Sequence, residues 1–174
     1  MREQKGFSLI ELLIVVAIIL IIAAIAIPNL MRARIAANES AGASTVRTLN
    51  TAEVTYSTTY TSMGYAPSLV PLGPNGVDCT VPSLVTATSA CLIDGVLGAA
   101  AVSTKGAFKY AITASTNVAP VPDYMITATS LGTAMAKKDY CSNTDAVVRS
   151  QVENATPGTV IASPTACNAL AAIQ

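Results

Sequence analysis

An apolar segment of helix length near the N-terminus constrains this chain more than any other feature. Sixteen consecutive apolar residues run from Leu12 to Ile27, and between Phe7 and Ile27 only Ser8 and Glu11 are polar. As an α-helix, a segment of this length spans about 30 Å, which is the hydrocarbon thickness of a bilayer. The segment can therefore cross a membrane, and its single carboxylate requires an explanation.

The composition excludes several functional classes. The formal net charge is zero and no basic stripe is present, which argues against a nucleic-acid-binding surface. Histidine and Cys-x-x-Cys motifs are absent from the sequence, so a zinc site is not expected. We predict no metal ligands, no cofactor and no enzymatic activity. A calcium site at Asp139 and Asp145 is left open only as an alternative, because their spacing does not fit an EF-hand loop.

The four cysteines all follow the apolar segment: Cys79, Cys91, Cys141 and Cys167. An even number of cysteines behind a membrane-targeting N-terminus indicates two disulfides in an oxidising compartment. Pairing between nearest neighbours would join Cys79 to Cys91 and Cys141 to Cys167. Four cysteines allow three connectivities, and four buried, reduced thiols remain an alternative.

The orientation of the segment follows from the cysteines and not from the basic residues. Arg2 and Lys5 precede the segment, whereas Arg32, Arg34 and Arg47 follow it, so the positive-inside rule does not decide. Because disulfides form outside the cytoplasm, we place the C-terminal part of the chain there.

A secretory signal peptide is the first rival explanation. Ala24, Ile25 and Ala26 form an A-x-A-like tripeptide after an apolar stretch. Against it, the apolar run is longer than the usual signal core, and Pro28 would fall just after the cut.

We predict one long helix over about residues 8 to 60, kinked near Pro28. No proline follows Pro28 until the loop region, and apolar residues recur there at helical spacing. The first half of this helix is apolar all round, which suits lipid or other helices. The second half is amphipathic, with Leu49, Ala52 and Tyr56 on its apolar stripe, which suits packing against a globular head.

The rest of the chain predicts loops followed by an antiparallel sheet. Proline and glycine punctuate residues 63 to 82, and period-two alternation then marks strands at Phe108–Ala114 and Tyr124–Thr129, with a third strand-like run at Ala146–Gln151. A sheet of three or four strands laid on the amphipathic half of the helix gives an α+β fold with a disulfide-closed C-terminal region.

The N-terminal stretch KGFSLIELLIVVAIILIIAAIAIPN resembles the N-terminal segment of type IV pilins and of the related type II secretion pseudopilins. The likeness covers about 30 residues and rests on specific parts: a short charged leader that ends at Gly6, then Phe7, Glu11, the apolar run and Pro28. This resemblance implies the pilin fold. Beyond about residue 60 only the general pattern of loop, sheet and cysteine-closed end is similar.

The resemblance also implies processing and partners. A prepilin peptidase would cut between Gly6 and Phe7, and the new amine of Phe7 would be N-methylated. The chain would then divide into a leader (1–6), a transmembrane and filament-core segment (7–27), an amphipathic half-helix (28–60) and a head (61–174). Its partners would be membrane lipid, the inner-membrane assembly machinery and then identical subunits. Its location would be the bacterial inner membrane and later an extracellular pilus, or the periplasm for a pseudopilin.

Glu11 has two compatible interpretations. Ser8 to Glu11 fits a capping box, in which Glu11 closes the helix start without any partner. Alternatively, because a carboxylate directed toward lipid is unfavourable, Glu11 pairs with the Phe7 amine of a neighbouring subunit and sets the register of assembly. Pro28, besides marking the membrane exit, would mark a stretch that unwinds on assembly.

We therefore expect a structural subunit that polymerises into a type IV pilus through packing of N-terminal helices. A minor pilin or a secretion pseudopilin is the alternative within the class. A secreted or membrane-anchored binding domain that never polymerises is the alternative outside it.

Overall fold

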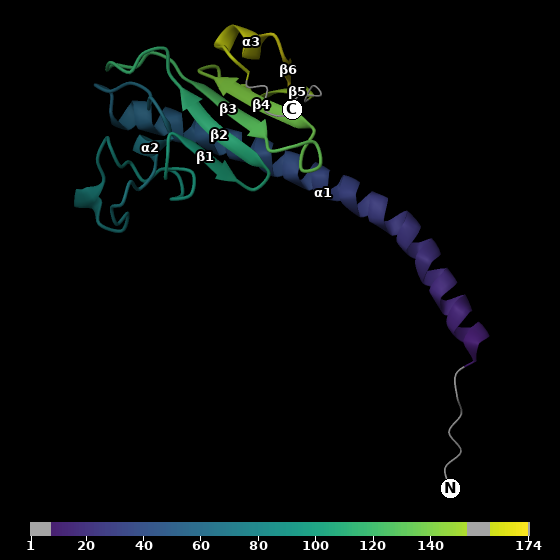
Figure 1. Ribbon diagram of the computed structural model, residues 1–174. Helices are drawn as coiled ribbons and strands as arrows, with labels where there is room; N and C mark the ends of the chain where they lie inside the picture. The colour runs from purple at the N-terminus through teal and green to yellow at the C-terminus, as the bar shows by residue number, and fades with distance from the viewer. Residues whose placement is uncertain (1–7, 153–160, 174) are drawn as a thin grey trace.

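One long helix, α1 (Leu9–Thr59, 51 residues), organises the whole molecule. The computed structural model describes residues 8–152 and 161–173, and Figure 1 shows the N-terminal half of α1 projecting away from a head that is built around the C-terminal half. The helix begins after Ser8, which is extended, and it ends at Tyr60. The expected helix over residues 8 to 60 is therefore present.

Pro28 lies inside α1 and does not end it. Proline has no N–H to donate to the carbonyl four residues earlier, yet the helix continues on both sides of the missing bond. Figure 1 shows the projecting half as a smooth curve, and a proline in mid-helix is an ordinary cause of bending.

A twisted antiparallel sheet lies across the C-terminal half of α1 (Figure 1). In the described part of the chain the sheet has six strands, which follow one another in sequence order, and each pairs with the next. They are β1 (Val102–Lys105), β2 (Phe108–Thr113), β3 (Met125–Ser130), β4 (Lys138–Asn143), β5 (Arg149–Val152) and β6 (Ala171–Ala172).

The strand number differs from the three or four expected, because β1, β4 and β6 were not recognised. β4 was not recognised because its sequence, KDYCSN, has no alternation of apolar and polar residues, although five of its six residues are buried. Its buried set includes Asp139, Ser142 and Asn143, which no hydrophobic pattern predicts. β1 and β6 are short edge strands of four and two residues.

The main core lies between α1 and the sheet. Val46, Leu49 and Tyr56 of α1 are buried together with Phe108 and Ile126 of the sheet. Ala52 is buried beside them, so the predicted stripe on the second half of the helix is the surface that meets the head. A smaller cluster on the other side of β4 joins Met125 and Cys141 to Ile161 and Cys167, the last of which belongs to α3 (Pro164–Asn168).

Two disulfides close the parts of the head that the sheet does not hold. One joins Cys79 to Cys91 with a Cα–Cα distance of 5.8 Å, and the other joins Cys141 to Cys167 at 6.0 Å. The first lies in the loop region that also carries α2 (Leu69–Leu72) and a 3₁₀ turn (Pro82–Leu84). The second ties α3 to β4 and so joins two segments that are 26 residues apart in the sequence.

Candidate functional site

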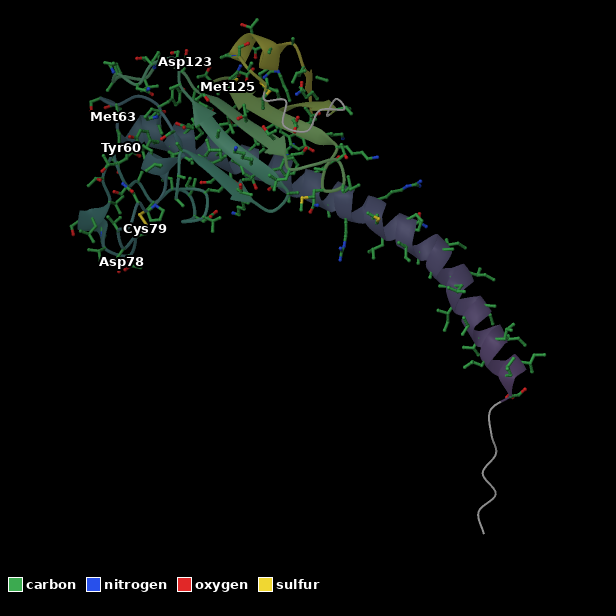
Figure 2. The ribbon with its side chains drawn as sticks, in the orientation of Figure 1. Tyr60, Met63, Asp78, Cys79, Asp123 and Met125 are labelled. Atoms are coloured by element: carbon green, nitrogen blue, oxygen red, sulfur yellow. A yellow bond between two sulfur atoms is a disulfide. The ribbon has the colours of Figure 1, made fainter. Side chains whose placement is uncertain are left out.

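The projecting half of α1 is an apolar surface that the head leaves uncovered (Figure 2). Among its large apolar side chains up to Met31, the least exposed is Val16 at 47% and the most exposed is Leu9 at 79%. Its most apolar 18-residue window has a mean hydropathy of 3.3, and none of that window is buried. By length and composition, α1 is therefore able to cross a membrane.

This surface is apolar on every side of the helix and not along one stripe. An amphipathic helix would keep one face for water, but a helix that is hydrophobic all round is stable only inside lipid or among other helices. Residues 9–31 therefore need a covering that the described head does not supply. Either a bilayer or neighbouring helices of the same kind would provide it.

The structure shows the capping role of Glu11. The backbone N–H of Ser8 donates a 2.9 Å hydrogen bond to Oε2 of Glu11, three residues along the chain. The Glu11 carboxylate thus satisfies one of the backbone donors that the start of the helix leaves without partners. No cation of the described residues forms an ion pair with Glu11.

Gly6 and Phe7, the residues of the expected cleavage and methylation, lie outside the described residues. The predicted pairing between Glu11 and a Phe7 amine therefore stays a prediction. Pro28 lies directly after the apolar run, and the helix is continuous through it. The unwinding of this stretch in the filament likewise stays a prediction.

A polar clamp fixes the point where α1 leaves the head. The Asn38 side chain donates a 2.8 Å hydrogen bond to the carbonyl of Met135, and Oε1 of Glu39 accepts one of 3.0 Å from the backbone N–H of Lys137. Oε2 of Glu39 lies 3.5 Å from Nζ of Lys138. The β3–β4 connection is thereby held against the helix, so the direction in which the apolar half projects is fixed relative to the sheet.

Sequence reasoning missed this clamp. The backbone N–H of Lys137 contacts Glu39, a residue 98 positions away. No local pattern signals such a contact, since neither Asn38 nor Glu39 departs from what an exposed helix face would carry.

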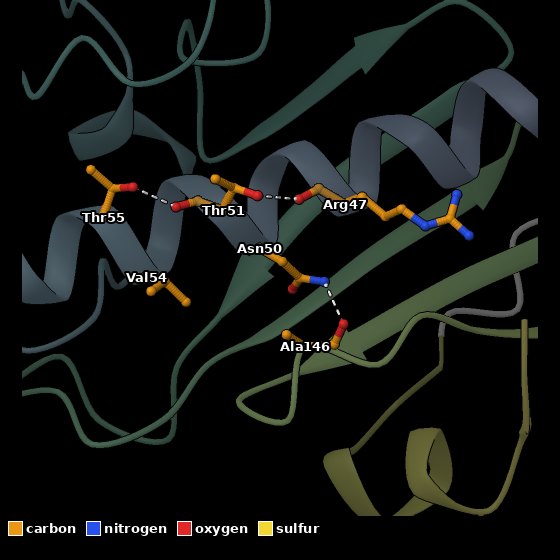
Figure 3. A pocket seen from close by; sticks show the side chains of 6 residues that line it. All are labelled: Arg47, Asn50, Thr51, Val54, Thr55 and Ala146. Atoms are coloured by element: carbon orange, nitrogen blue, oxygen red, sulfur yellow. Dashed lines mark hydrogen bonds between the residues drawn. The ribbon is translucent and has the colours of Figure 1, made fainter. Parts of the chain in front are cut away.

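A shallow groove on the uncovered face of α1 is lined by Arg47, Asn50, Thr51, Val54, Thr55 and Ala146 (Figure 3). Its volume is about 360 Å³, and its threonine and asparagine side chains bond to backbone carbonyls of the protein. The Thr51 hydroxyl donates to the carbonyl of Arg47 at 3.1 Å, and Thr55 donates to that of Thr51 at 2.8 Å. The Asn50 amide donates to the carbonyl of Ala146 at 3.3 Å. The groove presents no acid–base pair.

The two acids considered for calcium are used separately. Asp139 is buried and accepts a 2.7 Å hydrogen bond from the backbone N–H of Ser130, whereas Asp145 forms an ion pair with Arg149 at 2.6 Å. That pair holds the pKa of the Asp145 carboxyl below its usual value, mainly through the hydrogen bond from Arg149. Among the residues described, no group of three or more potential metal ligands was found.

Comparison with known proteins agrees with the geometry of the helix. Residues 1–27 match a family model described as the prokaryotic N-terminal methylation motif. The chain is also 39% identical, over 119 residues, to the type IV wide pilus major component of Thermus thermophilus. That alignment covers 63% of this chain and 89% of the relative. No solved structure matches the chain at a comparable level of significance.

Proposed function

This chain belongs to the type IV pilin family, and from that membership we propose that it is a structural subunit that polymerises into a pilus through packing of its N-terminal helices. The observation that carries the proposal is the apolar half of α1, which is exposed on all sides and projects from a head closed by disulfides. The pilin family is structural, and the similar Thermus protein is named as the major component of a pilus.

We propose two stages for the subunit, and in each stage other molecules bury the exposed apolar half of α1. In the first, residues 7–27 span the membrane and lipid surrounds the helix. In the second, the subunit enters an extracellular filament, where the apolar halves of neighbouring helices surround one another. Residues 28–60 then join this core to the head, residues 61–174.

Processing links the two stages. We propose that a prepilin peptidase removes residues 1–6, cutting between Gly6 and Phe7, and that the Phe7 amine is methylated. Only this cut creates a cation beside Glu11 in the apolar segment. A free amine near its reference pKa of about 8 is mostly charged at neutral pH, so it can pair with the carboxylate of an adjacent subunit. Such a pair would neutralise both charges in the apolar core of the filament and set its axial register.

The proposal is tested on cells that produce this chain, by shearing filaments from the surface and measuring the intact mass of the released subunit. We expect the chain to dominate the sheared fraction and to begin at methylated Phe7. A chain that begins at Ile27 would indicate a signal peptide, and one retained in the envelope would indicate a secretion pseudopilin. Either result overturns the proposal.

A variant pair sharpens this experiment. Gly6→Leu should leave the leader attached and keep the subunit in the membrane, because the peptidase would meet a bulky side chain at its cut. Gln4→Leu changes the leader to the same extent two residues away and should be processed normally. Equal processing of both variants would contradict a cut after Gly6.

A further inference from the structure

Basic side chains gather at the end of the head from which the apolar helix emerges. Half of the eight Lys and Arg residues that follow residue 7 lie there. We call this set the basal collar: Arg32, Arg34, Lys137 and Lys138. Arg32 and Arg34 are two residues apart on α1, which places them on nearly opposite sides of the helix. The collar therefore flanks the helix and is not confined to one face.

Three members of the collar share one groove. Arg32, Lys137 and Lys138 line an open groove of about 350 Å³ between α1 and the start of β4. Glu39 is the one acid among the described residues that line it, and it is already engaged by Lys138 and by the backbone N–H of Lys137. The groove thus keeps a net positive charge, and Glu39 acts to hold the lysines in place.

The distance of the collar from the apolar run matches a headgroup layer. Arg32 follows Ile27 by five residues, a rise of about 7.5 Å along a helix. Headgroup regions add roughly 5 to 8 Å on each side of the hydrocarbon core. With residues 7–27 in the hydrocarbon, Arg32 therefore lies at the level of the lipid phosphates. The lysines line the same groove as Arg32.

Among the described residues of the head, the exposed acids lie away from the collar or are paired with basic residues. Figure 2 shows Asp78 and Asp123 at the end of the head opposite the projecting helix. Asp94 and Asp145, two further exposed acids, are paired with Lys105 and Arg149. The described part of the head therefore presents positive charge toward the membrane and negative charge away from it.

We propose that the basal collar binds the phosphate groups of anionic phospholipids in the leaflet that faces the head, while the subunit is anchored in the membrane. Basic residues on the non-cytoplasmic side of a span are unusual, and anionic headgroups supply the counter-charge they need. The proposal rests on the membrane-anchored stage of the proposed function. It adds the class of lipid that the anchored subunit binds preferentially.

The test uses the processed full-length chain in bilayers of phosphatidylcholine that contain a trace of spin-labelled lipid. Electron paramagnetic resonance then gives the preference of the protein surface for phosphatidylglycerol over phosphatidylcholine. We expect a preference of several-fold. The triple variant Arg32→Gln/Lys137→Gln/Lys138→Gln removes the three collar members that share the groove and should remove most of this preference, since each basic residue at an anionic surface contributes up to roughly fivefold.

A matched variant removes the same number of charges from elsewhere on the head. Lys105→Gln/Lys109→Gln/Arg149→Gln should keep the preference, and 1 M salt should abolish it in the unmodified protein because screening is strong there. Equal preference for both lipids, or equal loss in the two triple variants, overturns the proposal.

The same samples separate a lipid site from a contact between subunits. If the collar triple variant lowers cross-linking between subunits in pure phosphatidylcholine and leaves lipid preference unchanged, the collar binds another copy and the lipid proposal is wrong. Failure of the filament function would appear in the sheared fraction and would not change the lipid preference of the anchored subunit. The two proposals can therefore fail independently.

Discussion

The backbone N–H of Ala66 donates a 2.8 Å hydrogen bond to Oε2 of Glu53, a residue with no exposed surface. The bond ties α1 to the segment that leads from it toward α2. The other carboxylate oxygen, Oε1, has no hydrogen-bond partner among the described residues. Burial therefore raises the pKa of Glu53 from 4.5 to about 8, and the bond from Ala66 offsets only part of that rise.

The raised pKa of Glu53 predicts that the head loses stability as the pH rises. Between pH 4.5 and about 8, the unfolded chain has released the Glu53 proton and the folded chain retains it. The free energy of unfolding should therefore fall by up to about 1.4 kcal/mol per pH unit in this window and level off on either side. Urea unfolding of the full chain in detergent micelles, followed by tyrosine circular dichroism at pH 5, 6.5 and 8, measures the slope.

Glu53→Gln should flatten that slope, because an amide keeps an acceptor for the Ala66 N–H and cannot ionise. Glu39→Gln, at the surface clamp, is the matched control and should keep the slope. A Glu53→Gln protein with the original pH dependence would show that another group is responsible.

Gly42 permits the close approach of α1 and the sheet. A Cβ at this position would lie 2.5 Å from Cε2 of Phe108, whose ring is buried in the core. Although alanine favours helices over glycine by about 1 kcal/mol, Gly42→Ala should lower the free energy of unfolding by roughly 1 to 3 kcal/mol through overpacking. Urea unfolding measures the change.

Gly95→Ala is the control for this prediction, since a Cβ there would meet only Cγ of Pro74 at 3.6 Å. It should change stability little. Phe108→Leu should recover part of the loss when combined with Gly42→Ala, because a smaller side chain frees the space. No loss in Gly42→Ala would mean that the helix and the sheet separate easily.

How much of this molecule the sequence predicts depends on how local each feature is. The long helix, its amphipathic second half and the alternating β2 and β3 follow from periodicities within single elements, and each is present. β4 was missed because it buries polar residues, so that its sequence does not alternate between apolar and polar. No local pattern predicts the need for Gly42, since the ring of Phe108 that a Cβ there would meet lies 66 residues away.

The candidate site divides in the same way. The apolar run and the capping bond of Glu11 depend on neighbours in sequence and could be predicted. The clamp at Asn38 and Glu39 could not, because its partners follow by 97 and 98 residues. The basal collar could not be predicted either, because it depends on the same clamp. The clamp places Lys137 and Lys138 beside the arginines of α1.

The two disulfides should protect different parts of the head. Chain entropy predicts that loss of Cys79–Cys91 or Cys141–Cys167, which are 12 and 26 residues apart, lowers the free energy of unfolding by about 3 and about 3.5 kcal/mol. Hydrogen exchange on the double Cys→Ala variants distinguishes them. Removal of Cys141–Cys167 should speed exchange in residues 161–173, and removal of Cys79–Cys91 should speed exchange in residues 73–98. The same pattern in both variants would contradict separate roles.

The charge of Glu11, as distinct from its capping bond, should be required for assembly. Glu11→Gln keeps an oxygen that can accept from the Ser8 N–H, and Glu11→Ala loses both the bond and the charge. If pairing with the Phe7 amine sets the register, both variants should yield at least tenfold fewer sheared filaments than the unmodified chain, because an unpaired amine would remain in an apolar core. The amount of processed subunit in the membrane, measured in parallel, should be unchanged for Glu11→Gln. Normal filaments from Glu11→Gln together with few from Glu11→Ala would leave the capping bond as the only role of this carboxylate.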